Sequence, residues 1–86
     1  IFEISHGPVN YSVVSSREVF QKALLANAVY IILIHNHPSG DPYPSNNDIT
    51  ITKQLKESGH MMNIELIDHI VVGGNTYVSL KKLQHI

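Results

Sequence analysis

The 86-residue chain contains no cysteine. This absence excludes a disulfide framework and any thiolate metal site, so a transition metal would have to be held by histidine and carboxylate side chains. It also fits a reducing compartment, and we expect a cytoplasmic protein. The longest apolar run covers residues 28–34, far short of the roughly 20 residues needed to cross a bilayer. We therefore expect no association with a membrane.

Charge of either sign is scarce, with six basic and seven acidic residues and a formal net charge of −1. The basic residues are scattered among acidic ones and do not form the basic face that is typical of a nucleic-acid-binding module. This distribution argues against direct binding of nucleic acid. A chain of this length buries one modest core, so we expect a single domain over residues 1–86.

The first half of the sequence predicts two extended segments, a helix and a strand. The extended segments cover residues 2–4 and 10–14, and Ser15 and Glu18 have the spacing of a capping box that opens the helix. Residues 29–34 are apolar and mostly β-branched, which is typical of a strand covered on both faces. Because the sequence begins within a predicted strand, we interpret the chain as the C-terminal portion of a domain whose N-terminal strand or strands are missing.

The second half predicts another helix, further strands and a terminal turn. Ser45 signals the start of the helix, and Gly59 is expected to end it in a left-handed capping conformation. Asp68 and His69 are expected in a loop between two short strands, and a glycine-rich turn then leads into a hairpin. The predicted strands cover residues 64–67, 70–72 and 77–79, and a helical turn is expected at 80–85.

Chemistry is concentrated where the apolar strand ends. His35 and His37 occupy alternate positions of an extended backbone, so both imidazoles can point to one face. Asp48 lies in the first turn of the next helix, where the helix dipole favours a carboxylate. Two histidines and one aspartate leave a fourth position for water, as in catalytic zinc sites, where the pKa of that water falls towards roughly 7. The sequence therefore predicts one zinc ion per chain.

Each of these residues also has a simpler explanation. An exposed histidine is usually only a polar residue, and Ser45 and Asp48 alone are explained as a capping pair. Asp41 is interpreted as a turn residue that hydrogen-bonds its own backbone, and the alternative is that its carboxylate acts as a spare oxygen ligand. His69 follows an aspartate that could support a ligand, but we interpret it as a structural position outside the ligand set. The joint arrangement of strand, histidine pair, rigid loop and helix start favours the metal site.

These residues also resemble a known family. His35-x-His37-Pro38 followed by Pro44-Ser45-x-x-Asp48 is similar to the JAMM motif of MPN-type metallopeptidases, and the string HNHPSGDPYPS resembles the RadC subfamily. The resemblance covers essentially the whole chain. It implies an α/β fold of the MPN/JAMM type, which is cytidine-deaminase-like, with a mixed β-sheet flanked by helices. The chain would be the C-terminal portion of such a domain.

The resemblance also implies a function. Zinc would be held by His35, His37 and Asp48, a zinc-bound water would attack an amide or isopeptide bond of a peptide or protein, and Ser45 would stabilise the oxyanion. The family's general-base glutamate lies on a strand upstream of the histidine pair, before this chain begins. Glu3 does not fit that position, because its strand follows the one that carries the base. We expect the chain to be weakly active or inactive, since a positioned base contributes roughly 10² to 10⁴ in rate.

Other functions remain open to different degrees. A catalytically inactive MPN-like scaffold or interaction module is the main alternative. The string His-Asn-His is not that of HNH nucleases, whose motif is spread over a hairpin and a helix, and a zinc deaminase would need paired cysteines. RadC proteins carry a DNA-repair label that the charge distribution does not support. An edge strand near Ile1, left unpaired, raises the hypothesis of a homodimer.

Overall fold

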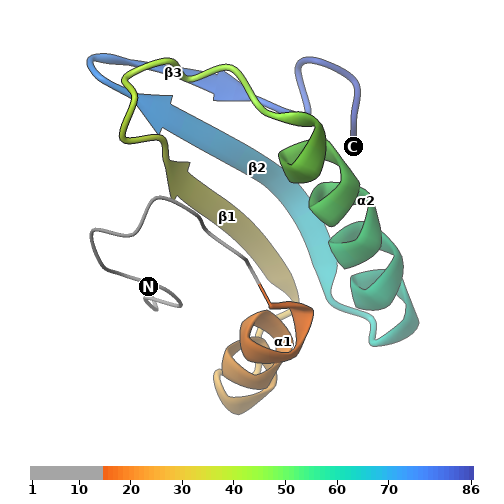
Figure 1. Cartoon of the computed structure of the whole chain (residues 1–86). Coiled ribbons are helices and arrows are strands. Elements are labelled where there is room, and N and C mark those ends of the chain that lie inside the picture. The colour runs from red at the N-terminus through yellow and green to blue at the C-terminus, as the bar shows by residue number, and fades with distance from the viewer. Residues whose placement is uncertain (1–14) are drawn as a thin grey trace.

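The structure is a computed structural model that describes residues 15–86, so the predicted segments at 2–4 and 10–14 and the edge strand near Ile1 lie outside the described residues. Strands β1 (Tyr30–Asn36) and β2 (Glu65–Gly73) are parallel, β2 and β3 (Thr76–Ser79) are antiparallel, and the sheet order is β1-β2-β3 (Figure 1). This mixed sheet with two helices confirms the α/β fold. In chain order the elements are α1 (Ser16–Leu25), β1 (Tyr30–Asn36), α2 (Asn46–Met61), β2 (Glu65–Gly73) and β3 (Thr76–Ser79).

Helix α2 connects the two parallel strands. Parallel neighbours require a crossover, so a connecting helix must begin near the carboxyl end of the first strand and return to the start of the second. Figure 1 shows the loop after β1 passing over the end of the sheet before it enters α2. The carboxyl end of β1 and the N-terminus of α2 are thereby brought together, and ligand sites of α/β sheets are usually found at this edge.

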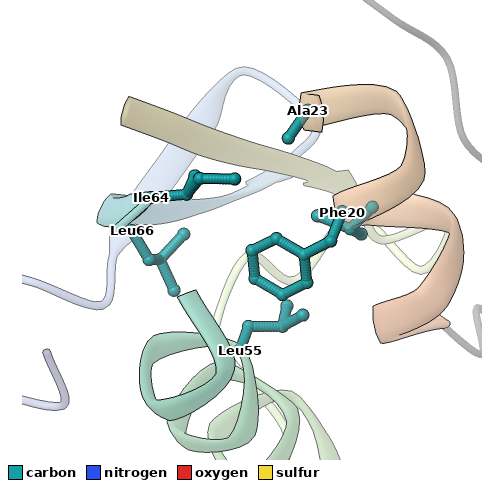
Figure 2. Close-up of a cluster of buried hydrophobic side chains, with 6 residues drawn as sticks. Phe20, Ala23, Leu55, Ile64 and Leu66 are labelled. Carbon is teal, nitrogen blue, oxygen red and sulfur yellow. The ribbon is translucent and has the colours of Figure 1, made fainter. Parts of the chain in front are cut away.

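The hydrophobic core lies between the helices and one face of the sheet. Ile31 and Leu33 of β1 pack against it from the sheet side. Figure 2 shows its side chains converging from α1, from α2 and from the segment that enters β2. Each large apolar side chain buried in this way stabilises the fold by about 1.5–3 kcal/mol. The buried members are Val19, Phe20, Ala23, Leu55, Ile64 and Leu66.

Strand β1 departs from its prediction, because only one of its faces is covered by the described residues. Its side chains alternate between exposed and half-buried along the strand. Tyr30, Ile32 and Ile34 are 63%, 54% and 70% exposed. Within residues 15–86 the expected covering of both faces is therefore not found. Apolar composition alone does not reveal how many faces are packed.

Strand β2 contains a β-bulge at its start. Ile31 of β1 pairs with Leu66, but the next residue, Ile32, pairs with Asp68, so Ile67 is an extra residue in β2. An extra residue shifts the alternation of side chains by one position. As a result Leu66 and His69 are both buried although one has an even number and the other an odd number. His69 thus lies within one continuous strand, which corrects its predicted place in a loop.

The end of helix α2 also corrects a prediction. The helix continues past Gly59 to Met61, and Asn63 adopts the left-handed conformation expected of Gly59, with φ 58°. Gly59 is required for a different reason. A Cβ atom there would collide with the backbone oxygen of Ile64 and touch the ring of Phe20. The glycine therefore permits close packing between α2 and the segment that enters β2.

The chain ends in a turn held by Asp68. Its carboxylate accepts hydrogen bonds from the backbone N–H of His69 at 2.7 Å, from the hydroxyl of Ser79 at 2.5 Å and from the backbone N–H of Lys81 at 3.0 Å. Where a helical turn was expected at 80–85, residues 80–84 form a turn that is not a regular helix. Neither helix in residues 15–86 has the length and apolar character that a membrane crossing requires.

Candidate metal centre

The end of β1 presents both histidines to the same side. His35 is the sixth residue of β1, and the backbone N–H of His37 donates to the carbonyl of Val72 at 2.8 Å. This bond extends the pairing with β2 beyond the last residue of β1. The backbone therefore stays extended through His37, and residues 35 and 37 share a face as the alternation predicts. Both imidazoles are largely shielded from solvent.

Asp48 is fixed by the first turn of α2. Ser45 is the N-cap residue, and its hydroxyl oxygen accepts a hydrogen bond from the backbone N–H of Asp48 at 3.1 Å. In return, Oδ2 of Asp48 accepts from the backbone N–H of Ser45 at 2.8 Å. This reciprocal pair is a complete capping box. It holds a buried carboxylate at the N-terminus of the helix, facing the end of β1.

The three side chains converge on one point. Nδ1 of His35 lies 3.2 Å from Oδ1 of Asp48, and Nε2 of His37 lies 3.0 Å from Oδ2. The candidate ligand atoms of His35, His37 and Asp48 all lie within 4.8 Å of one another. The two imidazole rings meet edge to face, with centroids 4.8 Å apart. The structure therefore brings together the three residues that the sequence singled out, and this cluster can hold a metal ion.

The hydrogen bond on the far side of His37 tests whether the cluster fits a metal. Nδ1 of His37 lies 2.9 Å from the backbone carbonyl oxygen of Asp41. A carbonyl oxygen can only accept, so Nδ1 carries the hydrogen, and Nε2 of a neutral His37 presents a lone pair to the carboxylate of Asp48. The 3.0 Å contact between Nε2 and Oδ2 of Asp48 can be joined by a proton on Nε2 or by a metal ion that both atoms bind, and in either case both atoms face the same point. Orientation of a histidine ligand by a backbone carbonyl is typical of metal sites.

The electrostatics of the site favour the protonation states that a metal needs. Burial is the main cause that lowers the pKa of His35, which keeps its imidazole neutral at neutral pH. Burial alone would raise the pKa of Asp48, but the hydrogen bonds of Ser45 and the nearby His35 and His37 outweigh it, and the pKa falls below its ordinary value. A neutral imidazole beside a carboxylate is the form in which both groups bind metal ions.

The loop that follows His37 is tightly held. Oδ1 of Asp41 accepts from the backbone N–H of Tyr43 at 3.0 Å, which confirms Asp41 as a turn residue. Its carboxylate does not belong to the cluster. The loop also lies close to the end of β2, because a Cβ atom at Gly73 would come within 2.7 Å of the oxygen of Gly40 and the nitrogen of Pro42. Glycine at position 73 is therefore required for this approach.

The sequence patterns did not indicate that two residues beneath the cluster belong to the site. Thr52 of α2 is 0% exposed and His69 of β2 is 1% exposed. Nδ1 of His69 lies 2.6 Å from Oγ1 of Thr52, and that hydroxyl donates to the backbone carbonyl of Asp48 at 2.7 Å. The ring of His69 also stacks with that of His35, with centroids 5.9 Å apart. Burial is the largest cause that lowers the pKa of His69 to about 4.

Comparison with known proteins identifies the family. A family model described as a RadC-like JAB domain matches residues 1–85. The chain belongs to this family. A UPF0758 protein of Clostridium perfringens is 54% identical over 80 residues, which cover 93% of this chain and 35% of that protein. A UPF0758 protein of Methanosarcina acetivorans is 50% identical over 78 residues, which cover 91% of this chain and 34% of that protein.

Membership of the RadC-like JAB family confirms the resemblance found in the sequence and agrees with the mixed α/β fold. The chain spans about a third of the length of the curated relatives it matches. Among residues 15–86, no glutamate belongs to the His35, His37 and Asp48 cluster. Ser45 is adjacent to the cluster through its hydrogen bonds with Asp48 and is exposed to solvent.

Proposed function

We propose that the RadC-like JAB domain of this chain holds one zinc ion on His35, His37 and Asp48 and serves a hydrolase that cleaves amide or isopeptide bonds in peptides or proteins. The observation that carries the proposal is the arrangement around His37. Its Nδ1 hydrogen is committed to the carbonyl of Asp41, so its Nε2 is the atom that faces the carboxylate of Asp48 and is available to a metal ion. A donor set of two histidines and one aspartate suits Zn²⁺ and leaves one position open.

A bound Zn²⁺ would supply Lewis acidity, which polarises a carbonyl oxygen and lowers the pKa of water. The side chains of this domain provide the rest of the site. The hydroxyl oxygen of Ser45 accepts from the backbone N–H of Asp48, and within the described residues its own hydrogen takes part in no hydrogen bond. We assign to that hydrogen the stabilisation of an oxyanion that forms beside the cluster. The exposure of Ser45 makes it accessible to a substrate.

The general base is the one element that the described residues do not provide. Asp48 is the acidic member of the cluster, and its two oxygens face His35 and His37. A carboxylate committed to the metal is a poor proton acceptor, so a second acidic residue is required. We propose a glutamate outside residues 15–86 for this role, as the family resemblance implies.

Metal content is the first experiment. The chain is purified without added zinc, and its metals are measured by mass spectrometry beside His35→Ala and Asp48→Asn, with His60→Ala as the matched control. His60 is an exposed histidine near the end of α2 that does not belong to the cluster. We expect one zinc per chain in the parent and in His60→Ala, and loss in the other two. A parent that takes up no zinc when it is supplied would overturn the proposal.

Hydrolysis is tested separately with a peptide and an isopeptide substrate, each with a fluorescent leaving group. The assay compares the 86-residue chain with the full-length Clostridium perfringens relative, with and without zinc. Zinc-dependent cleavage by the relative, and weak or no cleavage by the chain, is the expected result. If neither protein cleaves either substrate although both bind zinc, the hydrolase is rejected and a metal-binding scaffold takes its place.

A further inference from the structure

The buried contact between His69 and Thr52 joins β2 to α2, and the ring of His69 also reaches β1, so the two elements that carry His35 and Asp48 are connected through β2. His69 belongs to β2, Thr52 belongs to α2, and the ring of His69 stacks with His35 of β1. The hydroxyl of Thr52 contacts both His69 and the backbone of Asp48. Two of the three ligands are thus touched by one pair of buried residues.

The number of available donors assigns the hydrogens in these two contacts. The hydroxyl of Thr52 has one hydrogen, and it donates to the carbonyl of Asp48 at 2.7 Å. The hydrogen in the 2.6 Å contact with His69 must then come from Nδ1 of His69. This assignment leaves Nε2 of His69 as a bare lone pair. That atom is buried and has no hydrogen-bond partner in the described part of the chain, which is less costly for a lone pair than for an N–H group.

A threonine that bonds back to the helix is not unusual by itself, and α2 contains a second example. The hydroxyl of Thr50 donates to the carbonyl of Asn46 at 3.0 Å, four residues earlier, as Thr52 does to Asp48. Thr50 is exposed and its bond ends there. Only Thr52 connects its bond to a residue of the sheet. The difference between the two threonines isolates the contribution of His69.

We propose that His69 and Thr52 form a positioning pair, in which the Nδ1 hydrogen of His69 bonds the hydroxyl of Thr52 to hold the first turn of α2 at Asp48, while the ring of His69 supports the imidazole of His35. This role deepens the proposed function, on which it rests. Neither residue is among the grouped ligands. The pair acts through Asp48 and His35 and fixes the distance between the end of β1 and the start of α2.

The test measures zinc affinity by competition with a chelator and ligand geometry by the visible spectrum of the cobalt-substituted protein. Thr52→Val removes the hydroxyl but keeps the shape, and His69→Phe keeps the ring but removes the Nδ1 hydrogen. Loss of a hydrogen-bond partner of this kind typically weakens metal binding about 10- to 100-fold, and we expect that loss and a shifted cobalt spectrum in both variants. Thr52→Ser restores the hydroxyl and should recover both properties, and Thr50→Val is the matched control.

Two results would overturn the proposal that His69 and Thr52 form a positioning pair. Thr52→Val could bind zinc as tightly as the parent with an unchanged cobalt spectrum, which would make the contact purely structural. Alternatively, Thr50→Val could weaken binding as much as Thr52→Val, which would make the effect a general property of α2.

A further measurement does not depend on zinc. Nitrogen chemical shifts of the imidazoles in the metal-free protein should show the hydrogen of His69 on Nδ1, and the His69 signals should change in Thr52→Val. A hydrogen on Nε2 would reject the positioning pair even if zinc binds. If the parent binds no zinc but the hydrogen is on Nδ1, the proposed function fails while the contact itself is upheld.

Discussion

Helices α1 and α2 begin with the same pattern, a serine followed three residues later by an acidic residue, and they use it differently. In α1 the hydroxyl of Ser15 accepts from the backbone N–H of Glu18 at 3.4 Å, and this contact is exposed. In α2 the corresponding distance is 3.1 Å, and the carboxylate of Asp48 also accepts from Ser45. Only the second helix start faces two histidines.

The difference shows what turns a capping residue into a candidate ligand. A capping box uses only part of a carboxylate, because each oxygen has two lone pairs. Oδ2 of Asp48 contacts both Ser45 and His37, and Oδ1 contacts His35. The cap therefore stabilises the helix and aims the carboxylate at the end of β1. The pattern alone does not distinguish the two helices, but the strand that ends beside α2 does.

The largest effect that would sharpen this comparison is on metal binding. Asp48→Asn keeps an oxygen for the cap but removes the charge, and we expect zinc affinity to fall by more than the about 10- to 100-fold typical of changes outside the ligand set. Glu18→Gln, the equivalent change in α1, should leave affinity at the parent value. Equilibrium dialysis of both variants checks this. Equal losses in the two variants would mean that the start of α2 has no special role.

The next effect concerns acid stability and the residue beneath the start of α2. The pKa of His69 is lowered by burial to about 4 in the folded chain, against an ordinary value of 6.5, so between these pH values the unfolded chain binds more protons. The contribution of His69 to the free energy of unfolding is therefore fully present above about pH 6.5 and is lost as the pH falls to about 4. At 1.36 kcal/mol per pKa unit, the loss is about 3 kcal/mol. Urea unfolding across this range measures the slope.

In the same experiment His69→Phe should flatten most of that slope. A smaller slope should remain, because the pKa of His35 is also lowered by burial and contributes with the same sign. An unchanged slope in His69→Phe would show that another group is responsible for the acid sensitivity.

The caps themselves provide a smaller effect. Ser45→Ala removes half of a reciprocal capping box and should lower the free energy of unfolding of the metal-free protein by about 1 kcal/mol or more. Ser15→Ala removes the longer, exposed contact and should lower it by only about 0.5 kcal/mol. Both are measured by urea unfolding. A larger loss for Ser15→Ala would contradict the ranking that the two distances give.

The smallest effect tests whether α1 can be given the second half of the box. Glu18→Asp installs the acidic residue that closes the box in α2, and the gain in stability should be no more than about 0.5 kcal/mol. The gain should disappear when Ser15→Ala is added, because the two side chains would then no longer be coupled. A gain that survives the second substitution would come from the helix dipole alone.

The candidate ligands could be predicted from the sequence because local rules place them. Alternation along an extended strand puts His35 and His37 on one face, and the capping pattern puts Asp48 in the first turn of the next helix. Features that depend on contacts between distant segments could not be predicted in this way. The need for Gly59 was attributed to a left-handed cap, whereas it comes from the approach of Ile64.

The position of His69 was missed for a similar reason. The sequence around Asp68 and His69 gives no sign of an extra residue in β2, because a bulge arises from the pairing of two strands rather than from propensity. The burial of Thr52 is equally hidden, since a threonine in a helix is usually exposed or bonded back to its own helix. Sequence patterns thus predicted the candidate ligands, whereas the buried residues beside them could be found only in the structure.

The single extra residue at Ile67 also decides whether β2 places a neutral or a charged side chain beneath His35. With the bulge, β2 offers the neutral ring of His69 to the site and leaves Asp68 to hold Ser79 and Lys81. Without it, the alternation of β2 would turn Asp68 towards α2 and His69 away. A second carboxylate would then stand near Asp48 and add negative charge beside the candidate ligands. One residue in the length of a strand thus sets the charge beside the candidate metal site.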